Sequence, residues 1–128
     1  DSEYVPEAGR LLEELYNKLA YKELLSARLY RNLGTYRGDN YQSAIIVANN
    51  ALKKYPTCDS REELLFIILE SRYKQAYASK DETKMERFEG ALDEYYSYAN
   101  EYPDGKFKKQ AERIHADLNN ILKRNKTK

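Results

Sequence analysis

Apolar residues recur three and four positions apart along most of the chain, a spacing that places them on one face of an α-helix. This pattern predicts five helices, at 7–36, 41–55, about 60–77, 84–102 and 106–123. Gly34 and Gly38 lie where the first helix should end. Pro56 should end the second, because the residue before a proline avoids the helical region. The predicted fold is therefore all-α, with about five antiparallel helices.

The third predicted helix is apolar on nearly every side. Leucine, isoleucine and phenylalanine fill 64–69 without a break. Such a helix is expected at the centre of a fold, where its neighbours cover it on both sides. The run is much shorter than the roughly 20 residues that span a bilayer, so it predicts a buried helix. Asp59 or Ser60 is the expected N-cap, with Glu62 and Glu63 in the electropositive first turn.

The sequence repeats itself at an offset of 47 residues. Residues 41–45 match 88–92, and 54–56 match 101–103. The first eight residues resemble 104–111 in the same way, so we expect the chain to be a fragment that begins at the end of an earlier repeat. The predicted organisation is a single helical-repeat domain, 1–128: a long first helix plus a repeat helix (7–56), a second helix pair (59–103), a terminal capping helix (104–124) and a frayed tail (125–128).

Charge is unevenly placed along the chain. The net charge is +1, which argues against a nucleic-acid partner because such proteins normally have a strong basic surplus. Residues 105–128 hold eight Lys or Arg against two acidic residues, a surplus of +6, and the first 104 residues carry −5. The simpler interpretation of the basic tail is a solvated helix end that complements the helix dipole. The alternative is an electrostatic contact with an acidic partner or anionic lipid.

Residues suited to catalysis or metal binding are sparse. Cys58 is the single cysteine, so an internal disulfide is impossible and a small packed thiol is expected. Glu112 and His115 form one Glu-x-x-His half-motif of a di-iron bundle, which needs a second such motif and two further carboxylates. His115 also lies on an apolar ridge with Ala111 and Leu118, so we expect a packed imidazole. Since the sequence also has no phosphate-binding Gly loop or nucleophile elbow, we expect no enzyme activity, no metal site and no cofactor.

Tyrosine is abundant, at 13 of 128 residues. Its ring gives a large, stiff contact area with a polar tip and is favoured at protein interfaces. Five tyrosines are candidates for a partner-binding concave face of the helix array: Tyr30, Tyr36, Tyr73, Tyr77 and Tyr96. Packing between helices is the competing explanation for them.

Two resemblances follow from these motifs. Alanines at 44, 48 and 51 followed by Pro56 resemble the second helix of a tetratricopeptide pair, which implies a right-handed α-α superhelix. KLAYKE at 18–23, ARLY at 27–30, the Tyr-Pro-ended helix and REEL at 61–64 resemble the C-terminal half of the BamD family, the outer-membrane lipoproteins of the β-barrel assembly machinery. EYYSYANEYP at 94–103 is most similar to the Bacteroides-type branch.

The BamD resemblance implies a non-catalytic scaffold at the periplasmic face of the Gram-negative outer membrane. A lipid anchor, absent from this fragment, would hold the full-length lipoprotein there; Cys58 lies in an inter-helix turn and is not that anchor site. The implied partner is a BamA-like barrel-assembly subunit, with other assembly-complex proteins, and Arg61 and Glu62 are the implied contact residues. An arginine suits this role because its planar fork binds a carboxylate bidentately. The alternative function is a general peptide- or protein-binding tetratricopeptide adaptor outside that complex.

Overall fold

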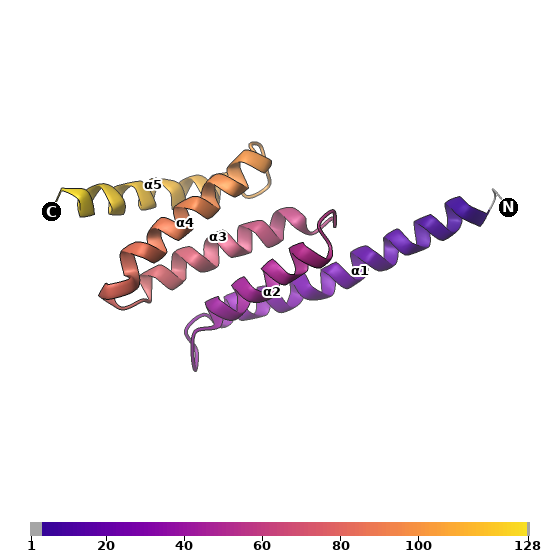
Figure 1. Ribbon diagram of the computed structural model, residues 1–128, viewed down its shortest axis with the longest axis horizontal. Helices are drawn as coiled ribbons and strands as arrows, with labels where there is room; N and C mark the ends of the chain where they lie inside the picture. The colour runs from indigo at the N-terminus through magenta and orange to yellow at the C-terminus, as the bar shows by residue number, and fades with distance from the viewer. Residues whose placement is uncertain (1–3, 128) are drawn as a thin grey trace.

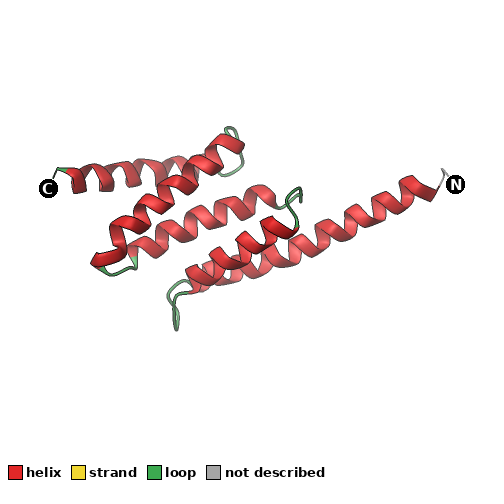
Figure 2. Cartoon of the chain, in the orientation of Figure 1, coloured by secondary structure: helices red, strands yellow, loops and turns green. Residues whose placement is uncertain are grey.

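The computed structural model describes residues 4–127, which form five α-helices (Figures 1 and 2). They are α1 (Tyr4–Leu33), α2 (Asn40–Lys54), α3 (Arg61–Tyr77), α4 (Asp81–Glu101) and α5 (Lys108–Lys126). Each helix packs against the one before it in the opposite direction, and α3 also contacts both α1 and α5. The prediction of an all-α fold with five antiparallel helices is confirmed. Within residues 4–127, no helix is long and apolar enough to cross a membrane.

Several helix boundaries differ from the predicted ones. The first helix ends at Leu33 rather than at residue 36, because Gly34 turns the chain with a positive φ of 57° that glycine adopts without strain. The fourth begins at Asp81, three residues early, with Asp81 and Glu82 in its first turn. The predicted frayed tail, 125–128, overlaps the end of α5 at Lys126, and Lys128 lies outside the described residues. Lysine and arginine in its last turn favour the extra turn, since they complement the negative end of the helix dipole.

Two apolar clusters share α3. Its Leu64, Ile67 and Ile68 pack with residues of α1 and α2, including the alanines at 44, 48 and 51. On its other side, Phe66 and Leu69 pack with residues of α4 and α5. The small alanine side chains let α2 lie close to both of its neighbours. The third helix is therefore covered on both sides, as its all-round apolar character predicts.

Ion pairs and amide contacts fix how the helices are rotated against each other. Arg28 of α1 donates to both oxygens of Glu63 on α3, at 2.5 and 2.6 Å, and this hydrogen-bonded pairing holds the pKa of Glu63 below its usual value. Gln75, near the end of α3, donates from its amide nitrogen to Asp39 and Gln42 at the start of α2. These links tie the ends of α3 to both helices of the preceding pair.

The N-terminal half of α1 extends past the other four helices (Figure 1). Every residue from 6 to 15 is exposed, whereas Ala20, Leu24 and Ala27 further along the same helix are buried. The end of α5 lies at the opposite side of the molecule from the projecting part of α1 (Figure 1).

Candidate protein-binding surfaces

The turn between α2 and α3, residues 55–60, is held rigidly against α1. The backbone amide of Thr57 donates to the hydroxyl oxygen of Tyr16 at 3.1 Å, and the amide of Asp59 donates to the side-chain oxygen of Asn17 at 2.9 Å. Cys58 points inward and is only 4% exposed. Because two of its backbone amides are bonded to α1 and the side chain between them is buried, this turn presents a preformed surface to solvent.

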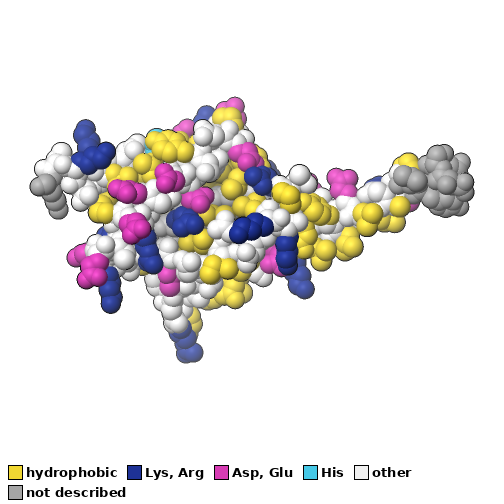
Figure 3. All heavy atoms as spheres, viewed as in Figure 1, with side chains coloured by type: hydrophobic (Ala, Val, Ile, Leu, Met, Phe, Trp, Pro, Cys, Tyr) yellow, Lys and Arg dark blue, Asp and Glu magenta, His cyan; other side chains and the backbone are white. Residues whose placement is uncertain are grey.

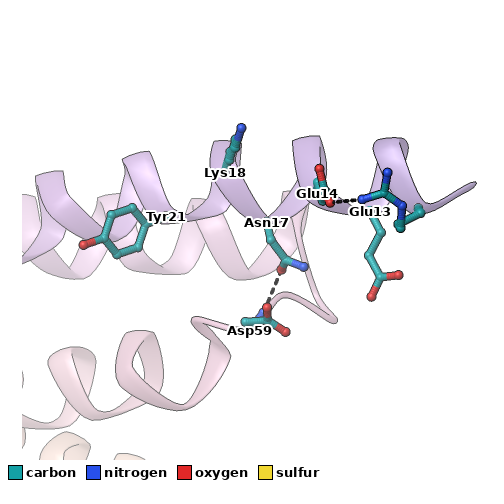
Figure 4. A pocket seen from close by; sticks show the side chains of 7 residues that line it. Glu13, Glu14, Asn17, Lys18, Tyr21 and Asp59 are labelled. Carbon is teal, nitrogen blue, oxygen red and sulfur yellow. Dashed lines mark hydrogen bonds and ion pairs between the residues drawn. The ribbon is translucent and has the colours of Figure 1, made fainter. Parts of the chain in front are cut away.

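A shallow hollow lies beside the turn, between it and the projecting part of α1 (Figure 4). Its lining carries both signs of charge: Arg10, Glu13, Glu14, Asn17, Lys18, Tyr21 and Asp59. Arg10 is paired with Glu14 at 2.5 Å and with Glu7, so its guanidinium is already partly neutralised. A mixed polar lining of this kind suits the charged and amide groups of a protein partner.

Arg61, predicted as a partner contact, is engaged inside the molecule. Its guanidinium binds Glu101 at the end of α4 through two hydrogen bonds, at 2.5 and 2.9 Å, and donates to the carbonyl of Pro56 at 3.0 Å. The hydrogen bonds from Arg61 lower the pKa of Glu101. The side chain remains 30% exposed at the edge of the α2–α3 turn. Contact between Arg61 and a partner stays a prediction. For such a contact, the guanidinium must either leave Glu101 or bind Glu101 and the partner at the same time.

Glu62 accepts hydrogen bonds that join three segments of the chain. One of its oxygens accepts hydrogen bonds from the hydroxyl of Tyr98 at 2.8 Å and from the backbone amide of Lys106 at 2.6 Å. The Tyr98 oxygen in turn accepts a hydrogen bond from the backbone amide of Phe107 at 3.1 Å. Burial, and then the bond to Glu62, raise the pKa of Tyr98 to about 12. This network joins α3 to the turn between α4 and α5. Partner binding by Glu62 is untested, and its visible role is structural.

Glycine at position 105 belongs to the same network. A Cβ atom there would lie 2.3 Å from a Glu62 oxygen and 2.6 Å from the Tyr98 hydroxyl. Sequence reasoning missed the network because its members are up to 44 residues apart along the chain. The one local signal is the glycine itself, two residues after the second Tyr-Pro pair's proline.

Tyr73 and Tyr77 contact α5 from α3. Both hydroxyls donate to one oxygen of Asp117, and their rings meet edge to face at 5.2 Å. Tyr77 also packs edge to face on Phe88 of α4 at 5.0 Å. Replacing either ring with alanine would remove core contacts, so these two tyrosines serve first to join helices.

The other three candidate tyrosines are scattered. Tyr30 packs against the cluster shared by α1, α2 and α3, whereas Tyr36 is 61% exposed in the α1–α2 turn, under the guanidinium of Arg37. Tyr96 is 46% exposed on α4 and touches His115 edge to face. Of the five, only Tyr73 and Tyr77 have rings in contact in the described part of the chain. We therefore find no single aromatic surface that gathers all five.

His115 stacks flat on Tyr95, with ring centroids 4.0 Å apart and an angle of 6° between the planes. The prediction of a packed imidazole agrees with this geometry. Among residues 4–127, no group of three or more His, Cys, Asp or Glu side chains is placed to hold a metal ion. Comparison of the chain with protein-family models, with curated proteins and with solved structures finds no match.

Gly105→Ala should lower the free energy of unfolding by about 1–3 kcal/mol, because the added methyl displaces Glu62 or Tyr98 from their hydrogen bonds. Gly90→Ala is the matched control: it lies within α4 with open space around its Cβ position, and should raise stability by about 0.5–1 kcal/mol. Urea denaturation followed by circular dichroism measures both. Equal effects of the two substitutions would contradict the crowding at residue 105.

Stability should fall as pH rises from about 10 to about 12. An unfolded tyrosine loses its proton near pH 10, whereas Tyr98 in the fold keeps its proton until about 12, so the folded state binds more protons in this interval and loses its advantage as they leave. Tyr98→Phe should make the decline shallower. Denaturation midpoints at pH 8, 10, 11 and 12 test this, and parallel declines for the two proteins would be the contrary result.

Proposed function

We propose that this chain is a non-catalytic scaffold that binds other proteins at the α2–α3 turn and the adjoining hollow. The observation that supports this most is the turn itself, whose amides at Thr57 and Asp59 are bonded to side chains of α1. A surface that is ordered before binding loses little conformational entropy when a partner docks. The charged hollow beside it offers groups that orient the partner (Figure 4).

The narrower form of the proposal is the C-terminal repeat region of a BamD-like outer-membrane lipoprotein. It rests on the resemblance carried by 18–23, 27–30 and 61–64. Its fold would be the tetratricopeptide superhelix, with α1–α2 and α3–α4 as helix pairs and α5 as the cap. Its partner would be the periplasmic domain of a BamA-like subunit, at the periplasmic face of the outer membrane. The REEL segment opens α3 directly after the fixed turn, where a docking partner could reach Arg61.

The alternative, a general peptide-binding adaptor outside that complex, has less support. It relies on Tyr73 and Tyr77 as free groove residues, and both hydroxyls are bonded to Asp117. A peptide would have to compete with this contact between α3 and α5.

Arg61→Ala should weaken binding to the purified periplasmic domain of the barrel-forming subunit by about tenfold or more, because arginine anchors carry much of the energy of such contacts. The matched control is Glu101→Ala, which breaks the same internal ion pair but leaves the guanidinium free. It should bind as well as the unmodified chain or better. Isothermal titration calorimetry measures all three proteins, and thermal unfolding checks that both variants lose similar stability.

Two results would count against the proposal in different ways. If the unmodified chain does not bind the periplasmic domain, the barrel-assembly proposal is wrong. If both variants lose affinity equally, Arg61 acts only by fixing the turn to α4 and is not a contact residue.

A further inference from the structure

A row of exposed leucines runs along the outer side of α1, and apolar side chains are visible on its projecting part (Figure 3). Seven leucines of this helix are between 38% and 67% exposed: Leu11, Leu12, Leu15, Leu19, Leu25, Leu29 and Leu33. One face of α1 is already buried in the fold through Ala20, Leu24 and Ala27. The helix therefore has two apolar faces, and the outer one lacks cover within residues 4–127. Contiguous exposed apolar surface of this kind marks an interaction site.

The outer face follows a heptad pattern, in which seam positions are separated by four and three residues in turn. We call these positions the α1 seam: Ala8, Leu12, Leu15, Leu19, Lys22, Ser26, Leu29 and Leu33. The seam spans nearly four heptads, and its apolar positions form two blocks, 8–19 and 29–33. Six of its eight residues are apolar, and the two polar ones are adjacent near its middle.

The opposite end of the helix row is different. On α5, Ala111, Ile114 and Leu118 are buried, and the outer side exposes Lys109, Glu112, Arg113, Asn120 and Lys123. A polar outer face is what a terminal helix needs to remain in water. The outer side of α5 is thus polar, whereas the exposed leucines of the described residues lie on α1 at the other end of the molecule.

Charge along α1 selects the direction of a pairing helix. Residues 4–17 contain three glutamates and one arginine, a net −2. Residues 18–33 contain four Lys or Arg and one glutamate, but Arg28 and Arg31 are paired with Glu63 and Glu70 of α3, so the remaining Lys18, Lys22 and Glu23 offer a net +1 to a second helix. Two parallel copies of α1 would place like charges side by side. Two antiparallel copies place the acidic half of each against the basic half of the other, which is favourable.

We propose that α1 pairs along this seam with α1 of a second copy of the chain, as a two-stranded antiparallel coiled coil. One register matches all eight seam positions: Leu12 packs on Leu29 of the partner subunit, Leu15 on Ser26 of the partner subunit, Leu19 on Lys22 of the partner subunit, and Ala8 on Leu33 of the partner subunit. Each contact occurs twice, as a two-fold interface requires. The aliphatic stem of Lys22 lies on a leucine while its ammonium group reaches water.

This interface leaves the proposed scaffold surface free. Asn17 and Tyr21, which line the hollow beside the α2–α3 turn, lie on the opposite side of α1 from Leu12 and Leu19 by helical spacing. Pairing through the seam and partner binding at the turn are therefore separate, and failure of one leaves the other standing.

Lys22→Leu is the most direct test, because it replaces the one charged residue of the seam with an apolar one. Sedimentation equilibrium should show a concentration-dependent dimer of the unmodified chain and at least a tenfold lower dissociation constant for Lys22→Leu. Lys53→Leu, at an exposed position of α2, is the control and should leave the constant unchanged. If all three proteins remain monomers at every concentration, or if Lys53→Leu strengthens association as much as Lys22→Leu does, the proposal is wrong.

Cysteine cross-linking in the Lys22→Leu background tests direction and register. Leu12→Cys mixed with Leu29→Cys should form a disulfide-linked heterodimer. Leu12→Cys alone should not cross-link, because antiparallel pairing places its two copies about 26 Å apart along the helices. Self-linked Leu12→Cys would show parallel pairing and overturn the proposed arrangement. Cys58 is buried and present in every sample, so any cross-linking through it would be equal in all of them.

Discussion

The structure depends on the burial of α3 from two sides at once. Leu64 and Ile67 are removed from water by α1 and α2, while Phe66 and Leu69 are removed by α4 and α5. A helix that is apolar nearly all round can be stable only between two layers. Each helix pair therefore lacks a complete core without the other, and the five helices behave as one unit rather than as two independent hairpins.

Polar contacts then decide the rotation and tilt that apolar packing leaves open. The pair between Arg28 and Glu63 fixes α1 against α3, and Glu62 with Tyr98 fixes α3 against the α4–α5 turn. Apolar contacts are not directional, whereas these hydrogen bonds require particular distances and angles. The proposed scaffold surface is rigid for this reason, since the turn that forms it is bonded to α1 and, through Arg61, to α4.

The five helices were predictable because each buries a face at helical spacing, a signal contained within about 15 neighbouring residues. Helix ends were less predictable, as α5 shows: it was expected to end near residue 123, and it continues to Lys126 with basic residues in its last turn. Most contacts of the candidate site could not be predicted from the sequence. That Arg61 would bind Glu101, or that Tyr73 and Tyr77 would share Asp117, depends on the packing of segments about 40 residues apart. The tyrosines could be identified as interface formers, but the sequence left open whether the interface lies within the molecule.

The placement of Cys58 affects how the protein behaves in oxidising surroundings. Its sulfur lies in the core between α1, α2 and α3, and burial raises the pKa of the thiol. Thiol–disulfide exchange requires both a thiolate and an accessible sulfur. A side chain that is 4% exposed and protonated at neutral pH meets neither requirement. In the folded protein this thiol is therefore protected from disulfide exchange with other thiol proteins.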